Sequence, residues 1–205
     1  MRSESETFDT RNKDAKEASR RVEEFLRSCV KVINVENVEN VREYQNQDID
    51  LLCTLEARSG RAIVSIEIKG DTKAHQTGNF FFETISNASL KTQGCFLKSQ
   101  ADLLFYYLME KDCLYIFPTK KVQYWFVMTQ EQLSAESPEQ YEKIFQLKKT
   151  HTVNAAGGYQ HTTIGRCVSI EYTKNSLSES KIPFKEIEEM GRWRCNLEDF
   201  CLEAI

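Results

Sequence analysis

Three residues of types used in catalysis lie at the ends of two strand-like segments of the sequence. Asp50 stands near the start of the first segment, and Glu67 and Lys69 close the second as an acid-x-lysine triplet. Because side chains alternate along a strand, Glu67 and Lys69 lie on the same face. Carboxylate oxygens are ligands that Mg²⁺ prefers, and a nearby lysine can orient or deprotonate an attacking water molecule. These residue types therefore indicate metal-assisted hydrolysis.

The apolar pattern of the two segments selects one register for a hairpin. A turn over residues 57–60 pairs Glu56 with Arg61, and counting back in steps of two places Asp50 opposite Glu67. On the other face this register gathers almost only apolar side chains, which are Leu51, Cys53, Leu55, Ala62, Val64 and Ile66. A slip by one residue would exchange the faces of the strand. Adjacent like charges repel, so the pairing of Asp50 with Glu67 predicts a cation between them.

Composition limits the class of protein. The chain has 205 residues, 40% of them hydrophobic, which favours one domain with a substantial core. Its apolar runs are too short to span a bilayer, and the first residues lack the apolar segment of a signal peptide. Seven cysteines, never spaced as C-x-x-C, predict reduced thiols and a cytoplasmic, intracellular protein. A net charge of −4 argues against a non-specific nucleic-acid coat but allows a local basic groove.

The sequence pattern predicts an α/β fold with a central mixed β-sheet flanked by helices. We expect a flexible N-terminus over residues 1–12 and a single domain over 13–205. The core of this domain is expected at 13–128, followed by a C-terminal elaboration at 129–205. The core elements are expected in the order helix, three strands, helix, two strands.

Individual patterns place elements outside the hairpin. Apolar residues of one face from Ala18 to Val30 predict a helix over 13–30. The spacing of Ser99 and Asp102 is that of a capping box and predicts a helix through Met109. Residues 148–166 are expected to form a positively charged loop. The other expected elements are strands at 31–35, 77–84, 113–117, 122–128 and 167–172, and helices beginning near Thr129, Ser137, Pro183 and Asn196.

The arrangement Asp50…Glu67-x-Lys69, on a hairpin after an N-terminal helix, resembles the PD-(D/E)XK nuclease superfamily. That superfamily includes restriction enzymes, Holliday-junction resolvases and repair nucleases, and the resemblance extends over residues 13–128. Ile49 stands where the family motif has proline, and Asp48 is an alternative first acid. We prefer Asp50 because it lies opposite Glu67 in the predicted register.

The resemblance implies a restriction-endonuclease-like core and a Mg²⁺-dependent endonuclease acting on DNA, with Mn²⁺ as a substitute metal. RNA is not excluded as a substrate, and cutting both strands of a duplex would suit a homodimer. The implied metal ligands are Asp50, Glu67 and the backbone carbonyl of Ile68. Lys69 would act on the attacking water or on the charge of the transition state.

Further residues are candidates for supporting roles. Additional acids near the metal could be Glu24, Asp48 and Glu83. The candidate nucleic-acid contacts are Lys73, Lys91, Lys98, Gln100, Lys148, Lys149 and Arg166. Each of these residues, taken alone, is more often an ordinary solvated side chain.

Two other interpretations stay open at this point. The fold could be nuclease-like but catalytically silent, serving as a nucleic-acid-binding or assembly subunit. The chain could also be a plain α/β domain of a larger complex, without metal chemistry. In that case the charged residues would form a cross-strand ionic ladder, with Asp48 pairing with Lys69.

Overall fold

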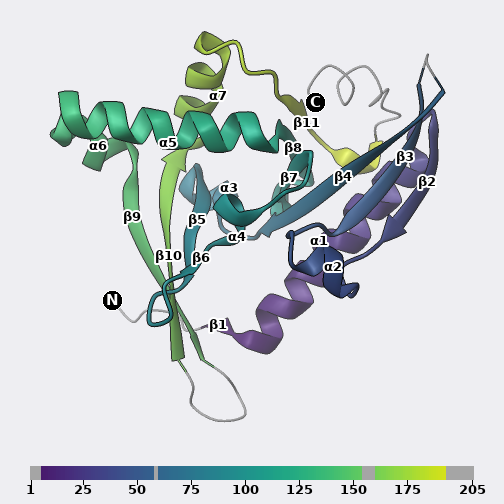
Figure 1. Ribbon diagram of the computed structural model, residues 1–205, viewed down its shortest axis with the longest axis horizontal. Helices are drawn as coiled ribbons and strands as arrows, with labels where there is room; N and C mark the ends of the chain where they lie inside the picture. Colours follow the sequence, from purple (N-terminus) through teal and green to yellow (C-terminus); the bar gives the residue numbers. More distant parts are fainter. Residues whose placement is uncertain (1–5, 58–59, 154–159, 193–205) are drawn as a thin grey trace.

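The computed structural model describes the backbone of residues 6–57, 60–153 and 160–192 as a mixed α/β protein with two sheets (Figure 1). A six-stranded mixed sheet consists, in sequence order, of β2 (Val32–Asn37), β3 (Leu51–Ala57), β4 (Gly60–Asp71), β7 (Leu103–Leu108), β8 (Cys113–Pro118) and β11 (Lys185–Ile187). A five-stranded sheet consists of β1 (Glu6–Thr7), β5 (Asn79–Asn87), β6 (Thr92–Gln93), β9 (Gln146–Val153) and β10 (Gln160–Ser169). The helices are α1 (Phe8–Ser28), α2 (Arg42–Gln45), α3 (Ala74–Thr77), α4 (Cys95–Lys98), α5 (Thr119–Glu136), α6 (Pro138–Ile144) and α7 (Ile170–Glu179), with 3₁₀ turns η1 (Met109–Lys111) and η2 (Met190–Arg192).

The six-stranded sheet has the strand order β11-β8-β7-β4-β3-β2. Strands β2, β3 and β4 form an antiparallel meander, β4 pairs in parallel with β7, and β8 and β11 complete the sheet in antiparallel fashion. The second sheet has the order β1-β9-β10-β5-β6, in which β1 pairs in parallel and the other pairs are antiparallel. The prediction of a central mixed sheet with flanking helices is confirmed at this level.

Helix α1 covers one face of the six-stranded sheet. Its buried residues are Ala18, Val22, Phe25 and Leu26, and Cys29 just after the helix joins them against the inward residues of β3 and β4. The predicted helical face is confirmed there, but Val30 is 58% exposed because the helix ends at Ser28. The helix begins at Phe8, before the expected start at residue 13, and residues 1–5 lie outside the described chain.

The other face of the six-stranded sheet packs against the second sheet and helices α5 and α7. Aromatic rings dominate this second core, with Phe80 and Phe82 from β5 meeting Tyr106, Phe117 and Phe126. Figure 1 shows α5 and α6 along one end of the long strands β9 and β10. The sheet is therefore covered on both faces around β7 and β8.

The capping-box prediction at Ser99 is wrong, because the apolar residues after it form β7 rather than a helix. All six residues of Leu103–Leu108 are buried, alternately against the α1 core and the aromatic core. A strand covered on both faces has no polar alternation, so its pattern does not distinguish it from a buried helix. Asp102 does not cap a helix either; its carboxylate accepts hydrogen bonds from the N–H and hydroxyl of Ser65.

Several predictions after residue 113 are also wrong. Residues 122–128 belong to α5, which runs unbroken to Glu136, so neither a strand there nor a helix start at Thr129 exists. The expected loop at 148–166 contains most of the β9–β10 ladder, where Lys148 pairs with Gly165. The expected edge strand at 167–172 is the end of β10 followed by α7.

Some of the remaining predicted elements are confirmed and others are not. The helix start at Ser137 is confirmed, with Pro138 as the first residue of α6. The segment from Pro183 carries the edge strand β11 instead of a helix, because it pairs with β8. The helix expected at 196–202 lies outside the described residues. The strand at 31–35 is confirmed as β2, and that at 77–84 as β5, which joins the second sheet.

Two further findings bear on the class of protein. Among the residues described, no helix is long and apolar enough to cross a membrane. Five cysteines, Cys29, Cys53, Cys95, Cys113 and Cys167, are free thiols, and the remaining two lie in the part of the chain that is not described.

Candidate active site

The β3–β4 hairpin has the register that its apolar pattern predicts. Leu51 pairs with Ile66, and Glu56 pairs with Arg61. Gly60 is itself paired with Ala57, one pair beyond the expected end of the ladder at Glu56 and Arg61. The ladder ends at the pair Leu51–Ile66, and just before it the N–H of Asp50 donates to the carbonyl of Ile66 at 2.9 Å.

Asp50 is held beside Glu67 by a second hydrogen bond. Its Oδ2 atom accepts from the backbone N–H of Ile68 at 2.7 Å. Ile68 lies between Glu67 and Lys69, so this bond fixes the Asp50 carboxylate against the acid-x-lysine triplet. The three predicted residues are therefore brought together on the face of the sheet opposite α1.

Burial makes this carboxylate pair electrostatically costly. Glu67 is only 9% exposed, and its burial, reinforced by the charges of Asp50 and Asp48, raises its pKa well above the usual value. Burial likewise raises the pKa of Asp50 to about 6, although the bond from Ile68 opposes the rise. Two adjacent carboxylates with raised pKa values form a site where a cation or a proton is needed to balance charge.

Asp48 places a third acid next to this pair. Its backbone adopts the left-handed conformation (φ 48°), which aspartate tolerates better than most residues. One carboxylate oxygen, Oδ1, lies 3.1 Å from Nζ of Lys98. The other, Oδ2, is buried and has no hydrogen-bond partner in the part of the chain that is described. A buried carboxylate oxygen without a partner is rare and needs an explanation, such as an ion.

Lys69 is the cation of the site and stays charged. Burial by itself lowers the pKa of an amine, but the acidic groups around Lys69 outweigh burial and raise its pKa. The largest of these interactions is with Cys95, followed by Glu83, Asp71 and Glu67. Glu67, Lys69 and Glu83 line one small pocket, together with the ring of Tyr106. Lys69 therefore acts as an ammonium group here.

Glu83 reaches the pocket from the second sheet. Its strand, β5, does not adjoin Glu67 within a sheet but faces it across the pocket. Its Oε1 atom accepts from the N–H of Cys95 at 3.4 Å. A Cβ at Gly94 would lie 2.6 Å from the carbonyl oxygen of Glu83, so only glycine allows this approach. Of the additional acids predicted, Asp48 and Glu83 thus lie near the pair.

Glu24 does not reach the site. It lies on α1, which covers the opposite face of the sheet, and it pairs with Arg20 and, at 3.9 Å, with Arg21. Glu24 was expected as an additional acid near the metal, but its side chain is exposed. Glu24 is therefore an exposed acid of the α1 surface.

Asp71 and Tyr106 belong to the site and were not predicted. The hydroxyl of Tyr106 donates to Asp71 and accepts from the N–H of Phe81 at 2.8 Å. Burial, together with Asp71, raises the pKa of Tyr106 far above its usual value, so the hydroxyl stays protonated. Asp71 could have been found from the sequence, because it follows Lys69 by two residues and shares its face of the strand. Tyr106 was missed because its segment was expected to be a helix, whereas it belongs to β7.

The predicted nucleic-acid contacts divide into near and distant residues. Lys98 and Gln100 lie beside Asp48, since Lys98 pairs with it and the N–H of Gln100 donates to the carbonyl of Gln47 at 2.8 Å. Lys73 is exposed just after the end of β4, and Lys91 is exposed between β5 and β6. Lys98 and Gln100 are thus the predicted contacts that printed distances place beside the acids.

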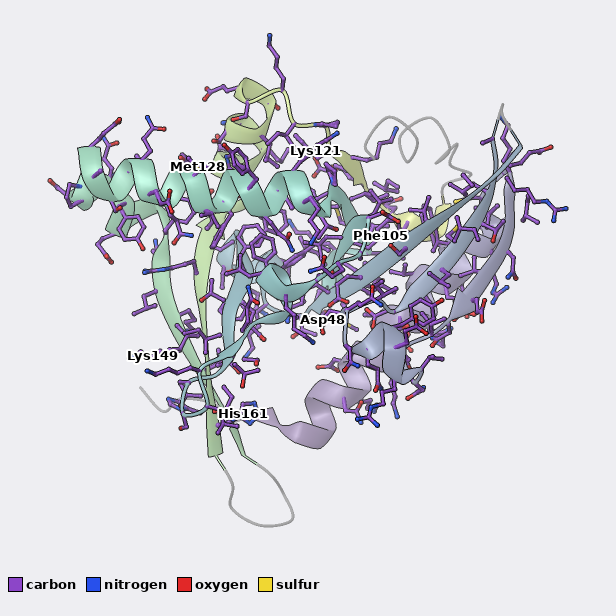
Figure 2. All side chains as sticks on the ribbon, in the orientation of Figure 1. Asp48, Phe105, Lys121, Met128, Lys149 and His161 are labelled. Atoms are coloured by element: carbon purple, nitrogen blue, oxygen red, sulfur yellow. The ribbon has the colours of Figure 1, made fainter. Side chains whose placement is uncertain are left out.

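The three contacts predicted at 148–166 lie elsewhere. Lys148 and Lys149 are exposed on β9, and Figure 2 shows Lys149 on the far side of that strand from Asp48. Arg166 lies with its guanidinium 5.1 Å from the ring centre of Tyr141 and donates to the carbonyl of Phe145 at 3.0 Å. Its role is to hold α6 on the second sheet.

The residues present suit Mg²⁺ better than a transition metal. No group of three or more histidine, cysteine or acidic side chains placed to hold a metal occurs within the described ranges. Mg²⁺ is commonly bound by one or two carboxylates and keeps several waters, so Asp50 and Glu67 suffice. Backbone groups alternate between strand edges, and the carbonyl of Ile68 therefore faces the same edge as that of Ile66, toward Asp50. The buried, unpartnered oxygen of Asp48 lies in this region as well.

A larger cleft of about 840 Å³ lies away from these residues, between α7 and the strands β8 and β11. Tyr115 and Lys174 both bond to Glu186 within it. The cleft contains none of the predicted site residues. Comparison with known proteins does not assign either site: no family model, curated protein or solved structure matches the chain.

Proposed function

We propose that the protein is a Mg²⁺-dependent endonuclease that hydrolyses phosphodiester bonds in DNA. The observation that carries this proposal is the placement of Asp50 beside Glu67, fixed by the 2.7 Å bond to Ile68, with the charged Lys69 on the same face. Acidic pairs of this kind bind hard cations, and phosphodiester hydrolysis needs one. Mn²⁺ should substitute for Mg²⁺, and the free thiols suit a cytoplasmic enzyme.

The order of elements supports a restriction-endonuclease-like core of the PD-(D/E)XK type. Helix α1 precedes the meander β2–β3–β4, and the pair β7–β8 follows after the single-turn helix α4. This order agrees with the proposed core, although the second helix is shorter than expected and β7 takes residues that were expected to be helical. Strand β5, which was expected as a strand of that core, lies instead in the second sheet with β6, β9 and β10.

Each residue has a distinct role in the proposed reaction. Asp50 and Glu67 would bind the metal with the carbonyl of Ile68, and the bound ion would neutralise the phosphate charge and lower the pKa of a water molecule. Lys69, held as an ammonium by Glu83 and Asp71, would orient the attacking water and stabilise the additional negative charge of the transition state. A charged Lys69 donates hydrogen bonds and cannot serve as the base in this state. Asp71 and Tyr106 hold the end of β4 against β5.

One observation favours the second candidate, a catalytically silent nucleic-acid-binding subunit. Lys98 already neutralises part of the acidic cluster through Asp48, as a protein cation can do in a site that has lost a metal. This candidate predicts binding of DNA without cleavage in either Mg²⁺ or Mn²⁺. The first candidate is preferred because Asp50, Glu67 and Lys69 are all retained and placed together.

A cleavage assay on supercoiled plasmid and labelled oligonucleotides tests the proposal. Cleavage should need Mg²⁺ or Mn²⁺ and stop in EDTA. Asp50→Asn and Lys69→Met should each lower the rate by about 100-fold or more, since each removes a charged group that acts in the transition state. Glu24→Gln, an exposed acid of α1, serves as a matched control and should cleave like wild type. Unchanged cleavage in both site variants would contradict the proposal.

A further inference from the structure

The exposed face at the start of α5 carries lysines and an aromatic side chain beside the candidate active site. We propose that this face, consisting of Lys120, Lys121, Tyr124 and Met128, binds an unpaired stretch of the nucleic-acid substrate. The inference rests on the proposed nuclease function and specifies the form of its substrate.

The charge of α5 is unusual for the beginning of a helix. Acidic residues are favoured in the first turn, where the helix dipole is positive, yet this first turn contains no acid and two lysines. The first acidic residue of α5 is Glu131, although the whole chain has a net charge of −4. The two lysines add to the positive potential of this helix end, and both attract an anion that approaches the exposed face.

Contacts join this end of α5 to the site. Nζ of Lys120 donates to the carbonyl of Ser99 at 2.8 Å, and the hydroxyl of Ser99 donates to the carbonyl of Asp48 at 3.0 Å. On the buried side of the helix, Gln123 donates to the carbonyls of Phe96, at 2.7 Å, and of Ser99. Phe96 lines the pocket of Glu67 and Lys69. A chain that leaves the site over Ser99 therefore meets the lysines of α5 first.

The exposed apolar side chains of α5 continue the same face. Tyr124 is 67% exposed and Met128 is 43% exposed, whereas Trp125 and Phe126 on the inner side are buried. Residues three and four apart share a helix face, so Lys120, Lys121, Tyr124 and Met128 form one stripe. Figure 2 shows Lys121 near the beginning of α5 and Met128 farther along it.

This combination fits a single strand better than a duplex. Lysines contact phosphates in either form, but an exposed tyrosine ring gains most by stacking on a base that has no partner. Bases of a duplex are stacked on each other and offer no free π-face to a helix surface. The stripe therefore favours substrates that expose unpaired nucleotides next to the cleavage site, such as single strands, flaps or branch points.

Fluorescence anisotropy with a labelled single-stranded DNA and the blunt duplex of the same sequence tests the inference. The full chain is used in EDTA, so that no cleavage takes place. Wild type should bind the single strand at least about 10-fold more tightly, since stacking contributes this much per base. Tyr124→Ala should remove most of this preference, and Tyr124→Phe should retain it because the ring is kept.

The lysines are tested by the salt dependence of binding. Lys120→Ala combined with Lys121→Ala should reduce the slope of log K against log salt by about 1.4, which corresponds to two phosphate contacts on a single strand. Lys13→Ala combined with Lys16→Ala removes the same charge from the exposed surface of α1 and should leave the slope unchanged. Equal slopes in the two double variants would overturn the inference.

Two further outcomes separate this inference from the nuclease proposal. If wild type cleaves DNA and the α5 variants bind and cleave as wild type does, the α5 binding surface is refuted and the nuclease proposal is supported. If the α5 variants lose single-strand binding but wild type never cleaves, the α5 binding surface is supported and the nuclease proposal is refuted. Loss of a dimer in light scattering by Tyr124→Ala, with DNA binding unchanged, would also refute the inference by making the face a protein contact.

Discussion

Asp50 accepts a hydrogen bond of 2.7 Å from the backbone N–H of Ile68, the residue that separates Glu67 from Lys69. The first carboxylate is thereby tied to the strand that carries the second, and its position does not depend on side-chain rotamers of β4. Glu67 is buried beside it, and burial raises the pKa values of both carboxyl groups.

Divalent ions should stabilise the folded protein through Asp50 and Glu67. An ion that binds only the folded state, at a concentration 100 times its dissociation constant, adds about 2.7 kcal/mol to the free energy of unfolding. Urea denaturation with and without Mn²⁺ should show this gain for wild type and for Glu24→Gln. Asp50→Asn should lose most of the gain, and an equal gain in all three proteins would place the ion elsewhere.

The metal-free protein should lose stability as the pH rises through about 6. The pKa of Asp50 is raised by burial from 3.8 to about 6, so the folded state binds a proton more tightly than the unfolded chain. The stabilisation is complete below the unfolded pKa and is lost as the pH rises through the folded pKa, and Glu67 acts with the same sign.

Denaturation in EDTA measures this pH effect. Between about pH 4 and pH 7, wild type should lose roughly 1–3 kcal/mol relative to Asp50→Asn, whose amide does not titrate. Added Mg²⁺ should reduce the loss at the upper end of this range. A stability difference that stays constant with pH would show that the Asp50 carboxyl is ionised in the metal-free fold.

Asp48 and Lys98 should change metal affinity in opposite directions. Asp48→Asn removes a negative charge next to the carboxylate pair and should weaken Mn²⁺ binding by about tenfold, the size of effect seen for groups that support metal ligands. Lys98→Met leaves Asp48 without its cation at 3.1 Å and should strengthen binding. Titration calorimetry measures both changes, with Glu56→Gln at the far end of the hairpin as a control. A common sign for the two variants would refute this arrangement.

Gly70→Ala should destabilise the fold by separating α1 from β4. A Cβ at Gly70 would lie 2.6 Å from Cβ of Ala18, so one of the two elements must shift. Overpacking of this kind costs about 1–3 kcal/mol, measured as a lower urea midpoint. Gly191→Ala is a suitable control because its nearest atom, on Asp112, would lie 3.4 Å away in ordinary contact. Equal midpoints for the two variants would contradict the packing of α1.

The hairpin could be predicted from sequence because its two faces differ. Leu51, Cys53 and Leu55 share one face of the strand, and only one register puts them against Val64 and Ile66. That register also brings Asp50 to Glu67, which is why the centre of the site followed from local pattern. The N-terminal helix was predictable for the same reason, since one side of it stays in water.

The surroundings of the site could not be predicted, because they depend on burial from both sides. Leu103–Leu108 lies between α1 and the aromatic core and has no polar alternation, so it resembles a helix as much as a strand. Because this segment was expected to be a helix, neither the position of Tyr106 nor the packing of β5, which carries Glu83, could be predicted. In α5, the exposed Tyr124 and Met128 extend an apolar run that is typical of a strand, although Val122, Trp125 and Phe126 have helical spacing.

The central claim is that Asp50 and Glu67 hold a divalent ion next to Lys69. Anomalous diffraction from crystals grown with Mn²⁺ tests it most directly. We predict one strong peak between the two carboxylates, within about 2.3 Å of an oxygen of each and close to the carbonyl of Ile68. The absence of a peak at saturating Mn²⁺, with Nζ of Lys69 bridging the two carboxylates instead, would contradict the account.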